Sequence, residues 1–401
     1  MPNPPTSITL KSQHAWPRLQ FSDFSWLSPA LVEPSGRGST DCYSSFYRWP
    51  DQWARCLIYA SAQKEGLLGL PRGSQLPFIV HNGLVAHAVS TCDTPTFSVQ
   101  ETLEAQAWIH AAQHPADCAS AQIGLDEYFN SGMGSSIFGT ANSFMLALVR
   151  GHVWLPIGSW SWGHCPLGTM ECFFKPVSNC AAPVKGLNAI DNVRYHSASS
   201  IHPLTHNRVL AVPLRWQHKG FLWWRAQVIT YMLRPNLNTT IALTAAAKLV
   251  FPKGLPRPFA SVFMRHGDKA PESPVFLGDK YLQMLELPNK QLQLKAVFMS
   301  SDTQEVLDDA LHTFNNAGFP AFAAPRNRGS SGNSSLPMKS FTGSFALDLL
   351  LDLFLLASAD VTVGISTSNW VRLVDSLRLG LGHGSQLLPL LDPFGIPYME
   401  W

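Results

Sequence analysis

The chain has 401 residues, enough for two domains of ordinary size plus an irregular extension. Apolar residues make up 46% and charged residues 14%, so a sizeable core is available and charge-driven disorder of the whole chain is excluded. The net charge of +2 gives no argument for nucleic acid or an anionic membrane surface as a partner. Residues that bind phosphate must therefore act locally.

Seven cysteines are spread along the chain without a CxxC pair or the Cys/His spacing of a zinc site. Their odd number fits either a reduced protein or one with a few secretory disulfides and an unpaired thiol. Glycosylation tripeptides at Asn238 and Asn333 favour a secretory compartment slightly. The first 30 residues carry prolines, serines and charges where an anchor needs an apolar run, so we expect no membrane anchor or signal segment in the chain as written.

The first half of the chain has a weak pattern. Residues 1–40 are rich in Pro and Ser and predict an irregular arm, and residues 41–115 predict an extension that is partly helical. Beyond it we expect a Trp-rich loop up to Cys180 and mostly loop over 181–215. Pro235 ends the last helix of this half. The predicted regular elements are helices over 49–64, 99–113, 143–150 and 221–233, and a strand over 152–157.

The last third of the chain alternates between strands and helices. This alternation predicts a parallel sheet with helices on both faces, whose ligands lie at the carboxyl ends of the strands. A Gly/Ser/Asn-rich loop over 326–335 interrupts it. The predicted strands cover 258–264, 296–300 and 361–365, and the predicted helices cover 280–287, 303–317, 344–358 and 369–378.

A charged loop, Arg265-His266-Gly267-Asp268-Lys269, directly follows the first of these strands. A sugar-nucleotide donor needs cations at such a place, because its diphosphate leaves with growing negative charge and a guanidinium can hold two oxygens at once. Asp268 would hold Arg265 or Lys269 in position. The alternative is a solvated loop whose charges pair with one another, and the residues alone leave both open.

Two further loops end the neighbouring strands. In residues 300–303, Asp302 with Thr303 makes a good helix N-cap, or else a carboxylate that touches the donor. In residues 364–369, Gly364 allows close backbone approach, and hydroxyls and N–H groups at a helix start suit a phosphate. An ordinary cap is the alternative there too. The hydroxyl residues of this last loop are Ser366, Thr367 and Ser368.

Three carboxylates are further candidates. Asp348 and Asp352 lie four residues apart on one face of the apolar helix over 344–358. Since a buried carboxylate is costly unless it is paired, one of them faces the cleft or bonds a partner, and the pattern does not choose between them. Glu272 follows the charged loop and could act as general base toward an acceptor hydroxyl, or be an exposed loop glutamate.

The chain lacks several other signatures of active sites. It has no nucleophile-elbow GxSxG and no Walker loop, and its histidines show no metal-ligand spacing. Gly132-Met133-Gly134 lacks the third glycine of a dinucleotide fingerprint. Four tryptophans could stack on sugars, but a core position is the more ordinary role of so bulky a residue: Trp160, Trp162, Trp223 and Trp224.

At these residues the chain resembles the alpha-1,6-fucosyltransferase family, including its nodulation-factor relatives, and the wider GDP-fucose transferase superfamily. Residues 262–269 are similar to the family's first motif, residues 299–302 to its second, and the stretch from Gly343 to Arg372 to its third. Upstream, the similar segments are Gly132 to Met145, Phe174-Lys175-Pro176-Val177-Ser178 with Cys180, and Trp223-Trp224 with Gln227, Tyr231 and Arg234-Pro235.

The resemblance implies an α/β, GT-B-like fold of two facing domains: an acceptor-side α/β domain over 116–250 and a Rossmann-like GDP-fucose-binding domain over 251–401. It implies metal-independent inverting transfer of fucose to a hydroxyl of a glycan or glycoprotein, with no cofactor. Arg265, with Asp268 and Lys269, would serve the diphosphate, and Glu272 would be the base. Further donor contacts would come from His266, Asp302, Asp352 (toward the guanine), Ser366, Thr367 and Ser368.

The resemblance further implies a Cys118–Cys180 disulfide and a Golgi or secretory lumen. The sequence departs from the family pattern in three places: His266 replaces the second arginine, Phe263 replaces a guanine-contacting histidine, and Glu272 lies one residue closer to the loop. Two alternatives therefore stay open, a catalytically inactive relative that binds glycan or GDP-sugar and a transferase for another sugar nucleotide. The acceptor could also differ from an N-glycan core.

Overall fold

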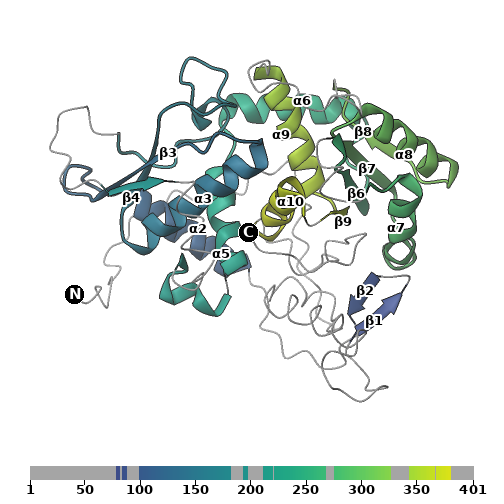
Figure 1. Cartoon of the computed structure of the whole chain (residues 1–401), viewed down its shortest axis with the longest axis horizontal. Helices are drawn as coiled ribbons and strands as arrows, with labels where there is room; N and C mark the ends of the chain where they lie inside the picture. Colours follow the sequence, from purple (N-terminus) through teal and green to yellow (C-terminus); the bar gives the residue numbers. More distant parts are fainter. Residues whose placement is uncertain are drawn as a thin grey trace.

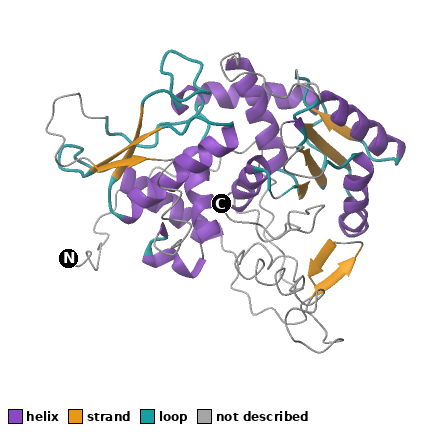
Figure 2. Cartoon of the chain, in the orientation of Figure 1, coloured by secondary structure: helices purple, strands orange, loops and turns teal. Residues whose placement is uncertain are grey.

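The computed structural model describes two α/β units that face each other, each built around a parallel sheet (Figures 1 and 2). Two short strands, β1 (Phe78–His81) and β2 (Leu84–His87), pair antiparallel before the first unit. The structure describes residues 78–81, 84–87, 99–181, 193–196, 211–219, 221–267, 275–326, 343–365 and 367–380.

The first unit has a three-stranded sheet in the order β4-β3-β5, with the first strand in the middle. Helix α3 is apolar around most of its circumference and is buried almost throughout, as expected for a helix enclosed on all sides. It packs on α5, as does α2, and Phe144 stacks on the fully buried Trp154. The elements are α2 (Val99–Gln113), β3 (Ile123–Glu127), α3 (Met133–Val149), β4 (Val153–Ile157), β5 (Val193–His196) and α5 (Phe221–Met232).

Two short 3-10 helices complete this unit, η3 (Met170–Cys172) and η6 (Leu214–Lys219). The helix after α5 in the chain is α6 (Leu237–Val250), which packs on a helix of the second unit.

The second unit has a four-stranded parallel sheet in the order β8-β7-β6-β9. Every residue of β6 and β7 is buried, which is why these strands are nearly continuous apolar runs. Numbered from β6, the order is 3-2-1-4, the order of half a doubly wound nucleotide-binding sheet. The strands are β6 (Phe259–Met264), β7 (Ala296–Ser301), β8 (Ala321–Ala323) and β9 (Val361–Gly364).

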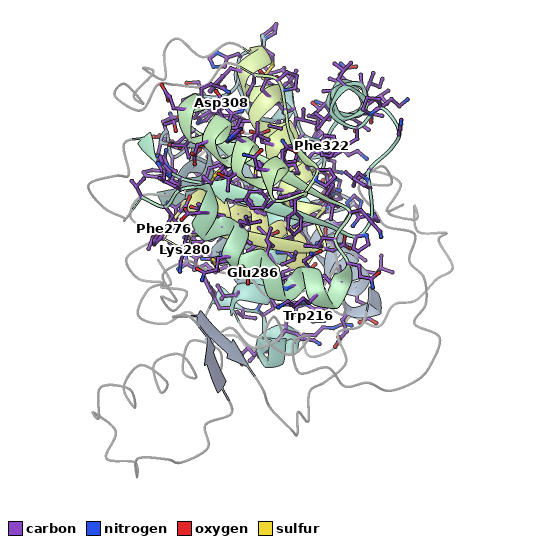
Figure 3. All side chains as sticks on the ribbon, turned by 90° about the vertical axis from the view of Figure 1, so that its right-hand side faces the viewer. Trp216, Phe276, Lys280, Glu286, Asp308 and Phe322 are labelled. Atoms are coloured by element: carbon purple, nitrogen blue, oxygen red, sulfur yellow. A yellow bond between two sulfur atoms is a disulfide. The ribbon has the colours of Figure 1, made fainter. Side chains whose placement is uncertain are left out.

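Helices cover both faces of this sheet. Ala260, Val262 and Met264 of β6 pack against α7 (Gly278–Leu292) and α8 (Gln304–Asn316), whose labelled residues Lys280, Glu286 and Asp308 lie in front of the sheet in Figure 3. Alternate residues of β6 pack on the other face against α9 (Gly343–Ala357). Because α9 lies between the sheet and α6, it is apolar nearly throughout.

Helix α10 (Asn369–Gly380) links the two units, since it packs on α5 and α3 of the first and on α9 of the second. Its last residue lies directly against α5: a Cβ at Gly380 would collide with Thr230 and would lie 2.6 Å from the carbonyl oxygen of Ala226. A glycine at this position therefore permits the close contact of the two helices.

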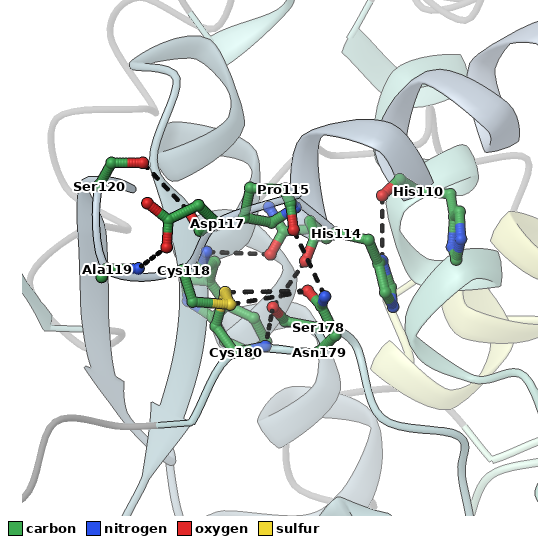
Figure 4. The surroundings of a disulfide bond; sticks show 12 residues. His110, His114, Pro115, Asp117, Cys118, Ala119, Ser120, Ser178, Asn179 and Cys180 are labelled. Atoms are coloured by element: carbon green, nitrogen blue, oxygen red, sulfur yellow. Dashed lines mark hydrogen bonds between the residues drawn. A yellow bond between two sulfur atoms is a disulfide. The ribbon is translucent and has the colours of Figure 1, made fainter.

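A disulfide joins Cys118 to Cys180, with their Cα atoms 5.5 Å apart, and ties the segment after α2 to the segment before residue 181. Around it, Ser178 Oγ donates to the Gln113 carbonyl at 2.6 Å and accepts from the Cys180 amide at 3.1 Å (Figure 4). A second disulfide joins Cys165 to Cys172 and was not predicted.

The predicted α/β fold with two facing units is confirmed. The helix over 99–113 and the elements of the last third are found within three residues of the predicted starts; α3 begins ten residues before the predicted 143. Five strands and one helix were missed, namely β1, β2, β3, β5, β8 and α6. The helix predicted over 49–64 and nearly all of the loop over 326–335 lie outside the described residues. Within the described residues, no helix has both the length and the hydropathy to cross a bilayer.

Candidate active site

Asp302, in the loop after β7, bonds two residues of the loop after β6. The Arg265 guanidinium forms an ion pair with the Asp302 carboxylate, and the other oxygen of that carboxylate accepts from the His266 backbone N–H at 2.9 Å. Both side chains of the ion pair are about one quarter exposed, 24% and 21%. Asp302 thus aims the arginine at the carboxyl edge of the sheet, while the arginine still reaches solvent.

His266 is buried, and its Nε2 lies 2.9 Å from the carbonyl oxygen of Phe276. A carbonyl only accepts, so Nε2 carries the hydrogen. Burial lowers the pKa of His266, and the hydrogen bond to Phe276 opposes this only in part. At neutral pH the ring is therefore an uncharged link across the loop rather than a second cation beside Arg265.

Asp352 is the buried member of the α9 pair, with no exposed surface, and Asp348 is half-buried. Ser300 Oγ donates to the Asp352 carboxylate at 2.6 Å, and Arg326 Nε donates to it at 2.8 Å. Arg326 also donates to the Ser301 carbonyl at 2.9 Å. Sequence reasoning missed Arg326, although it follows β8 at the same sheet edge as the other loops.

The loop after β9 turns sharply into α10. Ser368 is buried; its N–H donates to the Ile365 carbonyl at 2.9 Å, and its carbonyl accepts from the Arg372 N–H at 3.0 Å. The Ser368 carbonyl thus accepts a hydrogen bond from within the first turn of α10. Thr367 beside it is half-buried. Ser366 lies outside the described residues, and so do Asp268, Lys269 and Glu272 of the charged region.

A cavity of about 250 Å³ lies where the two units meet. Its polar wall combines residues from the loop after β3, from α3, from α5 and from the start of α10. Asn369 Nδ2 donates to Ser135 Oγ across this junction at 2.8 Å. The cavity is lined by Ser131, Ser135, Asn142, Arg225, Asn369 and Arg372, together with aromatic rings of Phe129 and Phe138.

Gly134 lets the two helix starts approach at this cavity. A Cβ on Gly134 would lie 3.1 Å from the backbone carbon of Asn369 and 3.2 Å from the Trp370 nitrogen. The Gly132-Met133-Gly134 segment, weak as a dinucleotide fingerprint, therefore has a packing role between the units. Arg225, also missed from sequence, lies 4.7 Å above the Phe138 ring and is buried.

The four tryptophans singled out from the sequence belong to the core. Trp160, Trp162, Trp223 and Trp224 are at most 4% exposed, and Trp160 Nε1 donates to Ser136 Oγ at 2.8 Å. They are not available to stack on a sugar. Among the described residues, no group of three or more His, Cys, Asp or Glu side chains is placed to hold a metal ion.

No family model matches the sequence, and no curated protein matches it. Among solved structures, the chain is similar to the fucosyltransferase NodZ from Bradyrhizobium, with 14% identity over 65% of this chain and 93% of that one and a TM-score of 0.37. It is similar to Arabidopsis thaliana FUT1 in complex with GDP, with 11% identity, coverage of 69% and 73%, and a TM-score of 0.41.

A third similar structure is POFUT1 in complex with GDP, with 12% identity, coverage of 64% and 94%, and a TM-score of 0.32.

Proposed function

We propose that the chain is a GDP-fucose-dependent fucosyltransferase of the alpha-1,6 type, which transfers fucose to a hydroxyl of a glycan or glycoprotein. One observation carries the proposal. The strand order of the second sheet reverses between β6 and β9, and the loops after these two strands hold Arg265 and the start of α10. Ligands of open α/β sheets bind at such a reversal, outside the carboxyl ends of the strands.

Each part of the donor has a candidate partner at this edge. Arg265 is aligned by Asp302 and suits the diphosphate, as does the amino end of α10 with Ser366, Thr367 and Ser368. Lys269, with Asp268 beside it, adds a second cation. Asp352 suits the N–H edge of guanine; it is fully buried, and Ser300 and Arg326 both bond its Oδ2.

The sugar would extend toward the cavity between the units. Two guanidinium groups, two carboxamides and two serine hydroxyl groups line this cavity beside the rings of Phe129 and Phe138, a mixture of polar and apolar groups that suits a sugar. The side opposite the donor would be the acceptor side, contributed by residues 116–250, with the donor domain over 251–401.

Transfer would proceed with inversion in one displacement. Glu272 takes the proton from the acceptor hydroxyl, the oxygen forms a bond to the anomeric carbon, and the bond from that carbon to the diphosphate oxygen breaks. The electron pair leaves with GDP, and Arg265 stabilises the developing charge, a task that a metal performs in other enzymes. We place this reaction in the lumen of the Golgi or another secretory compartment.

Two observations favour a second function, a relative that binds GDP-sugar or glycan without transfer. His266 is buried and its pKa is lowered by burial, so at neutral pH it would not supply the second cation that the family pattern has at this position. Phe263 is buried against Trp370, with ring centroids 6.3 Å apart, and has no polar atom to offer a base. A transferase for another sugar nucleotide is the third alternative.

One experiment separates these functions. The purified full chain is titrated calorimetrically with GDP-fucose, GDP-mannose and UDP-sugars, and GDP release is then followed with glycan acceptors. Preference for GDP-fucose with acceptor-dependent GDP release supports the proposal. Binding of GDP-fucose without release supports the inactive relative, preference for another sugar nucleotide supports the third function, and no binding of any donor contradicts all three.

A further inference from the structure

Helix α6 exposes an apolar face. Leu237, Ile241 and Leu249 are 73%, 59% and 74% exposed, while Leu243 and Val250 on the opposite side are buried. At 3.6 residues per turn, the three exposed residues fall within about a third of the helix circumference. The helix packs on α9 and lies near the top of the molecule in Figure 1. The exposed Lys248 also falls within this third of the circumference, and a largely apolar face of this kind favours association between molecules.

A glycosylation tripeptide begins inside this same face. Asn238-Thr239-Thr240 has the N-x-T pattern, and the 3.6-residue period puts Asn238 between Ile241 and Leu249 in angle around the helix. The Asn238 side chain is exposed. An acceptor asparagine must have just this freedom, because the attached sugar has to leave the surface without displacing packed groups.

Asn236, Thr239 and Thr240, next to Asn238 in the chain, form the hydrogen bonds that cap the start of α6. Asn236 Oδ1 caps α6 by accepting from the Thr239 N–H at 2.9 Å, and Thr240 Oγ1 donates to the Asn236 carbonyl at 2.9 Å. Asn238 has no part in this cap. A modification of its side chain therefore leaves the start of α6 intact.

The two disulfides point to the compartment in which this modification occurs. Disulfides such as Cys118–Cys180 and Cys165–Cys172 persist in oxidising compartments, chiefly the secretory pathway, where asparagine is also glycosylated. This observation is independent of the tripeptide and of the exposed face.

We propose that Asn238 carries an N-linked glycan and that this glycan covers the exposed apolar face of α6. The hydrated sugar would lie over Ile241 and Leu249 and keep two molecules from associating through α6. Neither the glycan nor the surface that it covers depends on the proposed transferase activity.

The site is tested with the full chain, expressed behind a cleavable secretion signal in a eukaryotic host. Peptide mass spectrometry and endoglycosidase treatment should show a glycan on Asn238 in the natural sequence and in Thr240→Ser, which keeps the tripeptide. The glycan should be lost in Asn238→Gln and in Thr240→Ala. Asn333→Gln removes any contribution of the other tripeptide. A natural-sequence protein with unmodified Asn238 overturns the proposal.

A separate experiment tests whether the glycan covers the apolar face of α6. Enzymatic removal of the glycan from the folded protein should increase self-association in light scattering several-fold. The change Ile241→Gln together with Leu249→Gln should abolish that increase, because it removes the apolar face itself. If the deglycosylated protein stays as monomeric as the glycosylated one, the glycan does not cover this face and that part of the proposal is wrong.

Discussion

Arg265 and Arg257 flank strand β6 at its opposite ends and have similar surroundings. Both pair with an aspartate and both are about one quarter exposed, but Arg265 follows β6 at its carboxyl end, whereas Arg257 precedes the strand and pairs with Asp360 at 3.2 Å. Only the carboxyl end is proposed to hold the donor. We expect Arg265→Ala to lower turnover at least a hundredfold, on the order of 3 kcal/mol, through lost charge stabilisation of the leaving diphosphate.

Arg257→Ala is the control for this prediction, and steady-state GDP release is the measurement. The control should retain turnover within a few-fold of the unchanged protein, because its guanidinium lies away from the donor edge. Equal losses in the two variants, or full activity in Arg265→Ala, would contradict the proposed role.

Arg326 is predicted to matter for stability. Asp352 is fully buried, and Arg326 is its charged partner, itself 5% exposed. Removing one member of a buried ion pair costs about 3–5 kcal/mol because the other charge is left in a dry environment. We therefore expect Arg326→Ala to lower the free energy of unfolding by about that amount in denaturant titrations.

The added change Asp352→Asn should recover much of this loss, because an amide keeps the hydrogen bond from Ser300 without the charge. If the single and the double variant are equally unstable, the charge of Asp352 is not the cause.

Gly134 lies where the starts of α3 and α10 come closest to each other. Gly134→Ala would press a methyl group onto the backbone of α10 at 3.1–3.2 Å, whereas no atom of the described residues lies within 4 Å of the Cβ position of Gly132. We expect Gly134→Ala to be destabilising by about 1–3 kcal/mol, as overpacking usually is. Gly132→Ala should have little effect. Thermal unfolding of the two variants checks this, and equal effects would mean that the contact does not limit the packing.

The docking of α2 on α5 is predicted to be sensitive to acid. His110 stacks on His114 with ring centroids 3.9 Å apart, its Nδ1 lies 3.1 Å from the Tyr231 hydroxyl, and the Arg234 guanidinium lies 3.6 Å from the Tyr231 ring. Burial, followed by the charges of His114 and Arg234, lowers the pKa of His110 to about 4. The pKa of His114 is lowered too, mainly by burial.

The folded pKa of His110 is thus below its unfolded value of 6.5, so the unfolded chain binds the proton more readily. The stability contribution is complete above pH 6.5 and falls as the pH decreases toward 4. Melting temperatures between these pH values should drop more steeply for the unchanged protein than for His110→Gln. His312→Gln, on the exposed surface of α8, is the control and should follow the unchanged protein. Parallel curves for all three would show that His110 does not contribute.

The sequence predicts those elements of the molecule whose hydrophobic pattern is visible within a few consecutive residues. The second sheet was predictable because β6 and β7 are continuous apolar runs separated by amphipathic helices. Helix α6 was missed because its exposed face is apolar too, which removes the contrast that marks a surface helix. β8 was missed because it has only three residues.

The candidate site was predictable only in part for a similar reason. Arg265, Asp302 and Asp352 could be singled out since each is a charge beside an apolar element. Their partners could not be predicted, because the strand order decides which loops meet. It brings Asp302 to Arg265, and it brings Arg326 to Asp352, 26 residues further along the chain. The contact of Asn369 with Ser135 joins residues 234 apart and depends on how the two units pack.

The proposed function requires a nucleotide diphosphate to bind where the strand order of the second sheet reverses between β6 and β9. A crystal structure of the full chain soaked with GDP tests this most directly. We predict diphosphate density within hydrogen-bond distance of the Arg265 guanidinium and the first N–H groups of α10. Density for GDP at another place, with Arg265 still paired only to Asp302, would contradict the account.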